Sequence, residues 1–154
     1  MDRVTLIVKV LLFASLAGLV GAAAMTAVMR LIARTRWTRA DMIIAVGSLL
    51  TKSRDNAFLV GLFLHGISAI TFGVTYTLLL MAVQLTKWPA AFFAGGAIGV
   101  FHGLVVSLSL CWVVADQHPL EEFRNVSMSI AVTHFIGHVV YGAVVGLVIS
   151  LVPI

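Results

Sequence analysis

The chain has 154 residues, of which 61% are hydrophobic and only 10% are charged. A soluble domain of this length carries about a quarter of its residues as charged ones, so the composition excludes a globule that faces water on all sides. The net charge of +4 does not indicate nucleic acid, because the basic residues gather at the ends of apolar runs, where they set membrane topology. We therefore expect a lipid bilayer and no nucleic acid as the surroundings of this chain.

Four stretches of the sequence are long enough and poor enough in charge to cross roughly 30 Å of hydrocarbon. Each is expected to be a helix, because a helix satisfies its own backbone hydrogen bonds in lipid. The predicted spans are 10–33, 57–86, 90–115 and 126–152. The sequence thus predicts an all-α membrane protein, a single four-helix bundle over residues 1–154.

The loop between the first and second spans is the longest, and it contains an apolar segment at 41–50. Basic residues flank this segment on both sides, which is typical of a short helix that lies in the membrane interface. The first and third loops together hold six Lys and Arg residues, against three on the other side of the membrane. The positive-inside rule then places the long first loop in the cytoplasm and both termini outside.

The third loop contains the segment Asp116-Gln117-His118-Pro119, followed by two glutamates. Proline in this position indicates a turn and a helix start, so we expect His118 to belong to a solvated loop.

The two halves of the chain, 1–86 and 87–154, show signs of an internal duplication. An offset of 69 residues aligns the second span with the fourth and pairs Asn56 with Asn125, His65 with His134, Phe72 with Tyr141, Gly73 with Gly142 and Leu78 with Leu147. An offset of 78 aligns the first span with the third and pairs Gly18 with Gly96 and Gly21 with Gly99. Two parallel helical hairpins would follow, with His65 and His134 at equivalent places near a common axis. The repeated small residues, such as Gly95, Gly99 and Gly103, predict close packing of helix backbones.

Four histidines fall inside the predicted spans at similar depth, together with one methionine of the first span. These candidate ligands are His65, His102, His134, His138 and Met25. His134, His138 and Tyr141 share one helix face, as do His65, Ala69 and Phe72. A polar ring in hydrocarbon needs a partner, so both faces are expected to point into the bundle.

Neutral imidazole is a good ligand for haem iron, copper and zinc. His65 with His134, or His102 with His138, would supply the two ligands of haem b, and Met25 and Met29 would add thioethers for copper. Two other interpretations remain open: histidines that only bond one helix to another, and a pocket for a polar small molecule or quinone. A proton-coupled pump is disfavoured, because no carboxylate lies within the spans.

The sequence resembles a bacterial group of small four-helix inner-membrane proteins of unknown function, related to the YagU type. The resemblance rests on three stretches: Ala17-Gly18-Leu19-Val20 with Met25-Thr26, then His65 with Phe72-Gly73, and His134-Phe-Ile-Gly-His138-Val-Val-Tyr141-Gly142. It implies a four-span fold in the bacterial inner membrane and marks His65, His134 and His138 as recurrent polar positions. It implies no activity.

These observations favour a non-catalytic accessory subunit or binding protein, whose buried histidines hold haem b or a metal ion. A larger membrane complex, or self-association, is the expected partner. The alternatives are a small oligomeric transporter or channel and a purely structural membrane subunit. No phosphate-binding loop, nucleophile elbow or HExxH pattern occurs in the sequence, which favours a protein that is not an enzyme.

Overall fold

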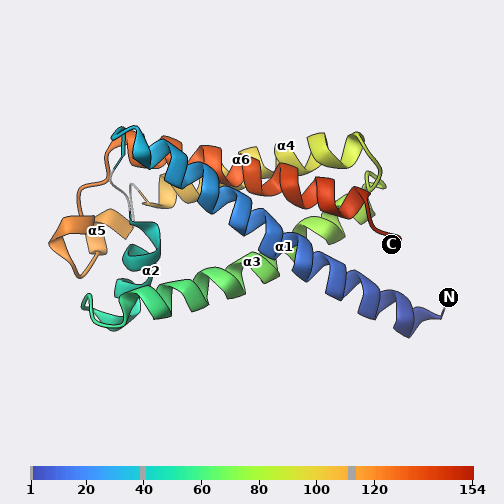
Figure 1. The fold of residues 1–154 in the computed structure, drawn as a ribbon, viewed down its shortest axis with the longest axis horizontal. Coiled ribbons are helices and arrows are strands. Elements are labelled where there is room, and N and C mark those ends of the chain that lie inside the picture. Colours follow the sequence, from blue (N-terminus) through green and yellow to red (C-terminus); the bar gives the residue numbers. More distant parts are fainter. Residues whose placement is uncertain (1, 39–40, 111–113) are drawn as a thin grey trace.

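In the computed structural model, the chain forms a bundle of long helices, and the structure describes residues 2–38, 41–110 and 114–154. No strand occurs within these ranges. The elements in chain order are α1 (Arg3–Arg34), α2 (Met42–Thr51), α3 (Ala57–Ala82), α4 (Ala90–Ser109), α5 (Ala115–Gln117), the 3-10 turn η2 (Glu121–Phe123) and α6 (Met128–Ser150) (Figure 1).

Four of these helices, α1, α3, α4 and α6, are long and apolar enough to cross a membrane. Large hydrophobic side chains such as Phe63, Phe93 and Phe101 are at least two-thirds exposed on the outside of the bundle. A surface of this kind is typical of a protein that contacts lipid. The prediction of an all-α chain with four candidate spans is therefore confirmed, and it indicates a multi-pass membrane protein.

The ends of the helices differ from the predicted spans where local hydrogen bonds decide them. Helix α1 begins at Arg3, well before the predicted residue 10, because the carboxylate of Asp2 accepts a hydrogen bond from Thr5 N at 2.8 Å and caps the helix. Helix α3 ends at Ala82, before the predicted 86, and Gln84 just beyond it adopts a positive φ of 58°. The predicted third span ran to 115, but residues 111–113 lie outside the described part of the chain.

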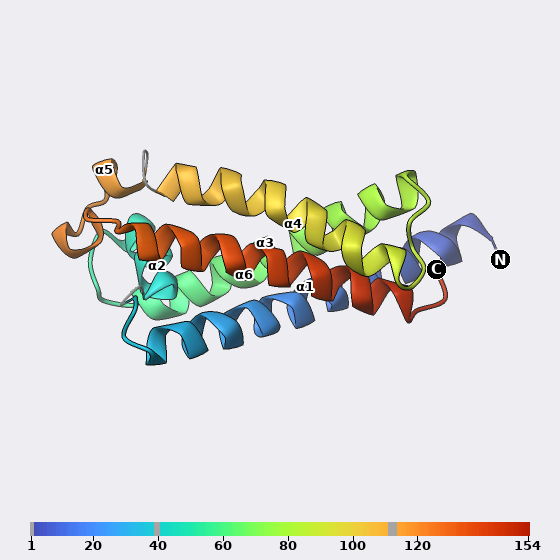
Figure 2. The ribbon, with the colours of Figure 1, turned by 90° about the horizontal axis from the view of Figure 1, so that it is seen from above.

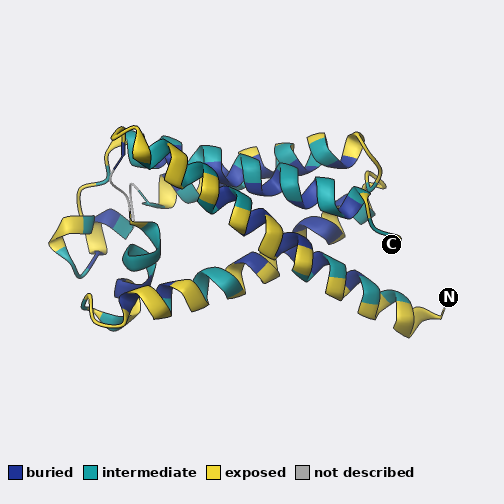
Figure 3. Ribbon diagram, viewed as in Figure 1, coloured by how far each residue is buried: buried dark blue, intermediate teal, exposed yellow. Residues whose placement is uncertain are grey.

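Helix α6 is the centre of the bundle and packs along both α1 and α4 (Figure 2). Its buried side is formed largely by small residues and histidines, and it is the most deeply buried of the four candidate spans (Figure 3). The predicted glycine packing on α4 is confirmed: a Cβ atom at Gly95 would collide with the Gly142 carbonyl, and one at Gly99 with the His138 carbonyl. Contact between backbones is therefore what holds α4 to α6.

Helices α1 and α3 cross near their midpoints in an open X (Figure 1). Gly18 of α1 and Gly73 of α3 meet at the crossing, and neither has room for a side chain. Beyond the crossing the two helices diverge, so a wedge opens between the second half of α1 and the first half of α3.

The first and third loops meet at one end of the bundle, opposite the two chain termini (Figure 1). We call this assembly of α2 with residues 114–124 the loop cap. Helix α2 lies against α3, and its Gly47 meets Gly61 and the Ala57 carbonyl too closely for any side chain. A helix in the first loop was predicted from the sequence, but its tight contact with α3 was not.

The expectation of a solvated His118 is wrong. His118 is only 1% exposed, and its Nδ1 accepts a hydrogen bond from Leu120 N at 3.1 Å. Nε2 therefore carries the proton and donates to the Ala45 carbonyl of α2 at 3.0 Å. Arg54 adds an ion pair with Glu122 at 2.7 Å, and this hydrogen-bonded carboxylate raises the pKa of Arg54. His118 is thus a structural link between the two loops.

Candidate functional site

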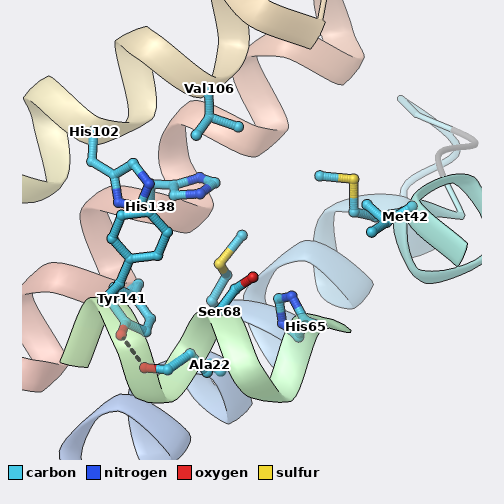
Figure 4. Close-up of a pocket in the computed structure, with 12 residues that line it drawn as sticks. Ala22, Met42, His65, Ser68, His102, Val106, His138 and Tyr141 are labelled. Atoms are coloured by element: carbon cyan, nitrogen blue, oxygen red, sulfur yellow. Dashed lines mark hydrogen bonds between the residues drawn. The ribbon is translucent and has the colours of Figure 1, made fainter. Parts of the chain in front are cut away.

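A cavity of about 220 Å³ lies in the wedge between α1 and α3, against α4, α6 and the start of α2. We call it the histidine pocket, because three histidines from three helices line it (Figure 4). Its lining consists of Ala22, Met25, Met42, Val46, His65, Ser68, Ala69, Phe72, His102, Val106, His138 and Tyr141. The cavity is smaller than the roughly 300–1,000 Å³ of typical organic-ligand sites, so its size favours a small ligand or an ion.

His102 and His138 lie side by side on α4 and α6. Their ring centroids are 4.6 Å apart, edge to face, and the centroid of the Phe72 ring lies 4.2 Å from that of His102. The hydroxyl group of Tyr76 is hydrogen-bonded to His102 Nδ1 at 3.1 Å. His102 is therefore held in place by groups from α3 and α6.

The two histidines of α6 are both bonded to their own helix. His134 Nδ1 lies 2.7 Å from the Ile130 carbonyl, and His138 Nδ1 lies 2.8 Å from the His134 carbonyl. Because a carbonyl oxygen can only accept, each Nδ1 carries the proton and each Nε2 carries a lone pair. This is the tautomer in which a histidine binds a metal through Nε2, with the backbone bond holding the ring in position.

His65 faces the pocket from α3, on the side away from His102 and His138 (Figure 4). Its Nε2 is buried and has no hydrogen-bond partner among the described residues. A buried polar nitrogen without a partner is costly, and such a group calls for an explanation in the form of a water molecule, an ion or a ligand.

Two further cavities adjoin the histidine pocket and share His65 with it. One, of about 490 Å³, extends toward the loop cap and is lined by Arg30, Thr38 and Asp41 among others. The other, of about 340 Å³, lies between α1 and α3 beside Ala23, Ala27 and Gly66. The histidine pocket therefore has a neighbouring cavity toward the loops and another between α1 and α3.

The structure brings together most of the residues that the sequence analysis singled out. His65, His102, His138 and Met25 all line the histidine pocket. The predicted face of α6 is buried, whereas the predicted face of α3 borders the pocket and leaves Phe72 38% exposed. His134 is buried but lies outside this lining, where its Nε2 is 2.8 Å from Met42 Sδ. Among the described residues, no hydrogen bond or ring contact joins His65 to His134.

Two participants were missed from the sequence, Met42 and Tyr76. Met42 belongs to a segment interpreted as interfacial, and only the return of α2 onto α3 brings it to the histidines. Tyr76 lies between Thr75 and Thr77, and its position four residues after Phe72 on the same helix was the one available signal.

Among residues 2–38, 41–110 and 114–154, no group of three or more His, Cys, Asp or Glu side chains is close enough to hold a metal ion. Any metal site here would therefore include other donors, such as the thioethers of methionine. No family model, no curated protein and no solved structure matches this chain.

Proposed function

We propose that this chain is a non-catalytic, multi-pass membrane protein that binds a metal ion through buried histidines. The observation that carries the proposal is that His65, His102 and His138 line one small cavity together with Met25 and Met42. Because no three of the histidines lie close enough to hold an ion by themselves in the described ranges, the proposed site combines imidazole with thioether donors. Neutral imidazole and thioether groups bind transition-metal ions such as copper, whereas hard metal ions such as magnesium and calcium prefer oxygen ligands.

The geometry favours an ion over haem b. The rings of His102 and His138 are in direct contact, with 4.6 Å between centroids, so no porphyrin plane fits between them. The cavity of about 220 Å³ is also small for a macrocycle.

We place the protein in a bacterial inner membrane, as its resemblance to the YagU-like group implies, with the loop cap in the cytoplasm. The excess of Lys and Arg in the first and third loops supports this orientation. Helix α2 would then lie at the cytoplasmic interface, beneath the headgroups and over the histidine pocket. A larger membrane complex or a second copy would cover part of the exposed apolar surface.

The proposed duplication is supported by the two hairpin contacts. Ala69 and Gly73 of α3 touch α1 at Gly18, while His138 and Gly142 of α6, their equivalents at an offset of 69, touch α4 at Gly99 and Gly95. These contacts favour pairing Gly18 with Gly99 rather than with Gly96, so the offset of the first and third helices becomes 81 in place of 78.

The proposal is tested by metal analysis and visible spectroscopy of the protein purified in detergent. We expect bound metal, or stoichiometric uptake of added copper, zinc or cobalt, and loss of it in His138→Ala and His65→Ala. His118→Ala is the matched control, because His118 is buried in the loop cap, outside the pocket. A protein that takes up no metal would contradict the proposal. A Soret band in the visible spectrum would show that the protein binds haem instead of a metal ion.

A further inference from the structure

The contact between His134 and Met42 is chemically unusual. His134 Nδ1 donates to the Ile130 carbonyl, so Nε2 carries a lone pair, and this lone pair meets Met42 Sδ at 2.8 Å. A thioether sulfur has no hydrogen to donate. Two acceptors therefore face each other at close range with no proton between them.

The surroundings do not relieve this contact. His134 is 1% exposed, and no carboxylate of the described residues lies within ion-pair distance of it. An added proton on Nε2 would create an unpaired imidazolium in an apolar site, which is costly. A bound cation, by contrast, would accept electron pairs from both the nitrogen and the sulfur.

Further donors of the same kind lie one helical turn deeper. His138 has the same tautomer as His134, and its Nδ1 makes the one hydrogen bond found for this ring among the described residues. Met25 and Met29 of α1 pack on Gly137, between the two histidines of α6, with their nearest atoms 3.1 Å from where a Cβ would be. Imidazole nitrogens and thioether sulfurs thus follow one another from the loop cap into the histidine pocket.

We propose that His134, Met42, His138 and Met25 form a site for a soft monovalent cation, copper(I). Thioether and imidazole donors select copper(I), whereas magnesium, calcium and manganese prefer oxygen ligands, and no Asp or Glu lines the histidine pocket. This inference rests on the proposed metal-binding function and names the metal and the residues that select it.

The test replaces the sulfur and keeps the histidines. Met42→Leu nearly conserves volume, so folding is retained, which thermal unfolding in detergent verifies. Copper(I) affinity is measured without oxygen by competition with a chromogenic copper(I) chelator, and cobalt(II) and zinc(II) are titrated in parallel. We expect copper(I) binding to weaken about tenfold or more, with cobalt and zinc binding unchanged.

Two further variants make the result specific. Met128→Leu is the control, because Met128 is 77% exposed and its loss should leave copper(I) affinity unchanged. Met25→Leu should weaken copper(I) binding as Met42→Leu does. Unchanged copper(I) affinity in both pocket variants would overturn this inference, as would binding of cobalt or zinc without copper(I), and either result would leave the general metal proposal standing. Uptake of no metal at all would contradict both.

Discussion

Two tyrosine hydroxyl groups form hydrogen bonds between helices beside the histidine pocket. Tyr141 of α6 donates to the Ala69 carbonyl of α3 at 2.8 Å, and Tyr76 is bonded to His102 at 3.1 Å. Their rings pack edge to face with centroids 5.5 Å apart. The two residues thus tie α3 to α6 and α4 at the depth where the histidines lie.

Tyr141→Phe removes one of these bonds and keeps the ring. We expect the free energy of unfolding to fall by about 0.6 kcal/mol, the mean value for hydrogen bonds between helices in a membrane. An SDS titration followed by circular dichroism measures the change. A loss of several kcal/mol would show that the hydroxyl group does more than join two helices.

The sequence predicted the pocket residues whose chemistry conflicts with lipid. His65, His102 and His138 stand out because a polar ring in an apolar run must face the interior. Met42 could not be predicted in the same way, since methionine is equally at home in lipid and in a protein core. Its role depends on the tertiary contact between α2 and α3.

At the scale of the helices, glycines decide which faces meet. Gly73 of α3 lies against the Ala14 carbonyl and Gly18 of α1, whereas a Cβ at Gly66 of the same helix would meet nothing within 4 Å. The two glycines are seven positions apart and nearly in line along the helix. The two glycines therefore serve as test and control: Gly73 lies at the helix crossing, and Gly66 lies beside open space.

Gly73→Ala is expected to destabilise the protein by about 1–3 kcal/mol, because α1 and α3 must separate to admit the methyl group. Gly66→Ala should be neutral or should stabilise by up to about 1 kcal/mol, the helix propensity that alanine gains over glycine. Thermal unfolding of both variants in the same detergent compares them. Equal effects would contradict the observed crossing.

The number of spans followed from hydropathy, because a helix needs a minimum apolar length to cross the bilayer, whereas caps and turns set where each helix begins and ends. The angle at which α1 and α3 cross could not be predicted from hydropathy. Apolar helices offer many glycine pairs, and only the full set of contacts selects one of them. The loop cap was missed for a similar reason. The partner of His118 is the Ala45 carbonyl in the first loop, which lies 73 residues earlier in the chain.

For the whole molecule, the loop cap places the first and third loops on one side of any membrane that the bundle crosses. Arg54 and Glu122 join the two loops across the sequence. Both chain termini lie at the opposite end (Figure 2). The proposed orientation, with the loop cap in the cytoplasm, is the one that the positive-inside rule predicts.

This orientation is tested by labelling single cysteines with a membrane-impermeable maleimide after Cys111→Ser removes the one native cysteine. In intact spheroplasts Thr86→Cys should react, whereas Asp55→Cys should react only after the membrane is permeabilised. Gln117→Cys, in the third loop, should behave like Asp55→Cys. The reverse pattern would invert the topology, and opposite behaviour of the first and third loops would contradict the bundle.

Helix α1 has 32 residues and is therefore about 48 Å long, whereas the 20 residues of α4 span about 30 Å. A bilayer with a hydrocarbon core of about 30 Å suits α4 and obliges α1 to tilt or to protrude. Helix α1 touches α3 at Gly18, near the midpoint of α1. A change of tilt about this contact would move the two ends of α1 in opposite directions. The end that carries Met25 would swing over the histidine pocket, so the thickness of the surrounding lipid would set how open that pocket is.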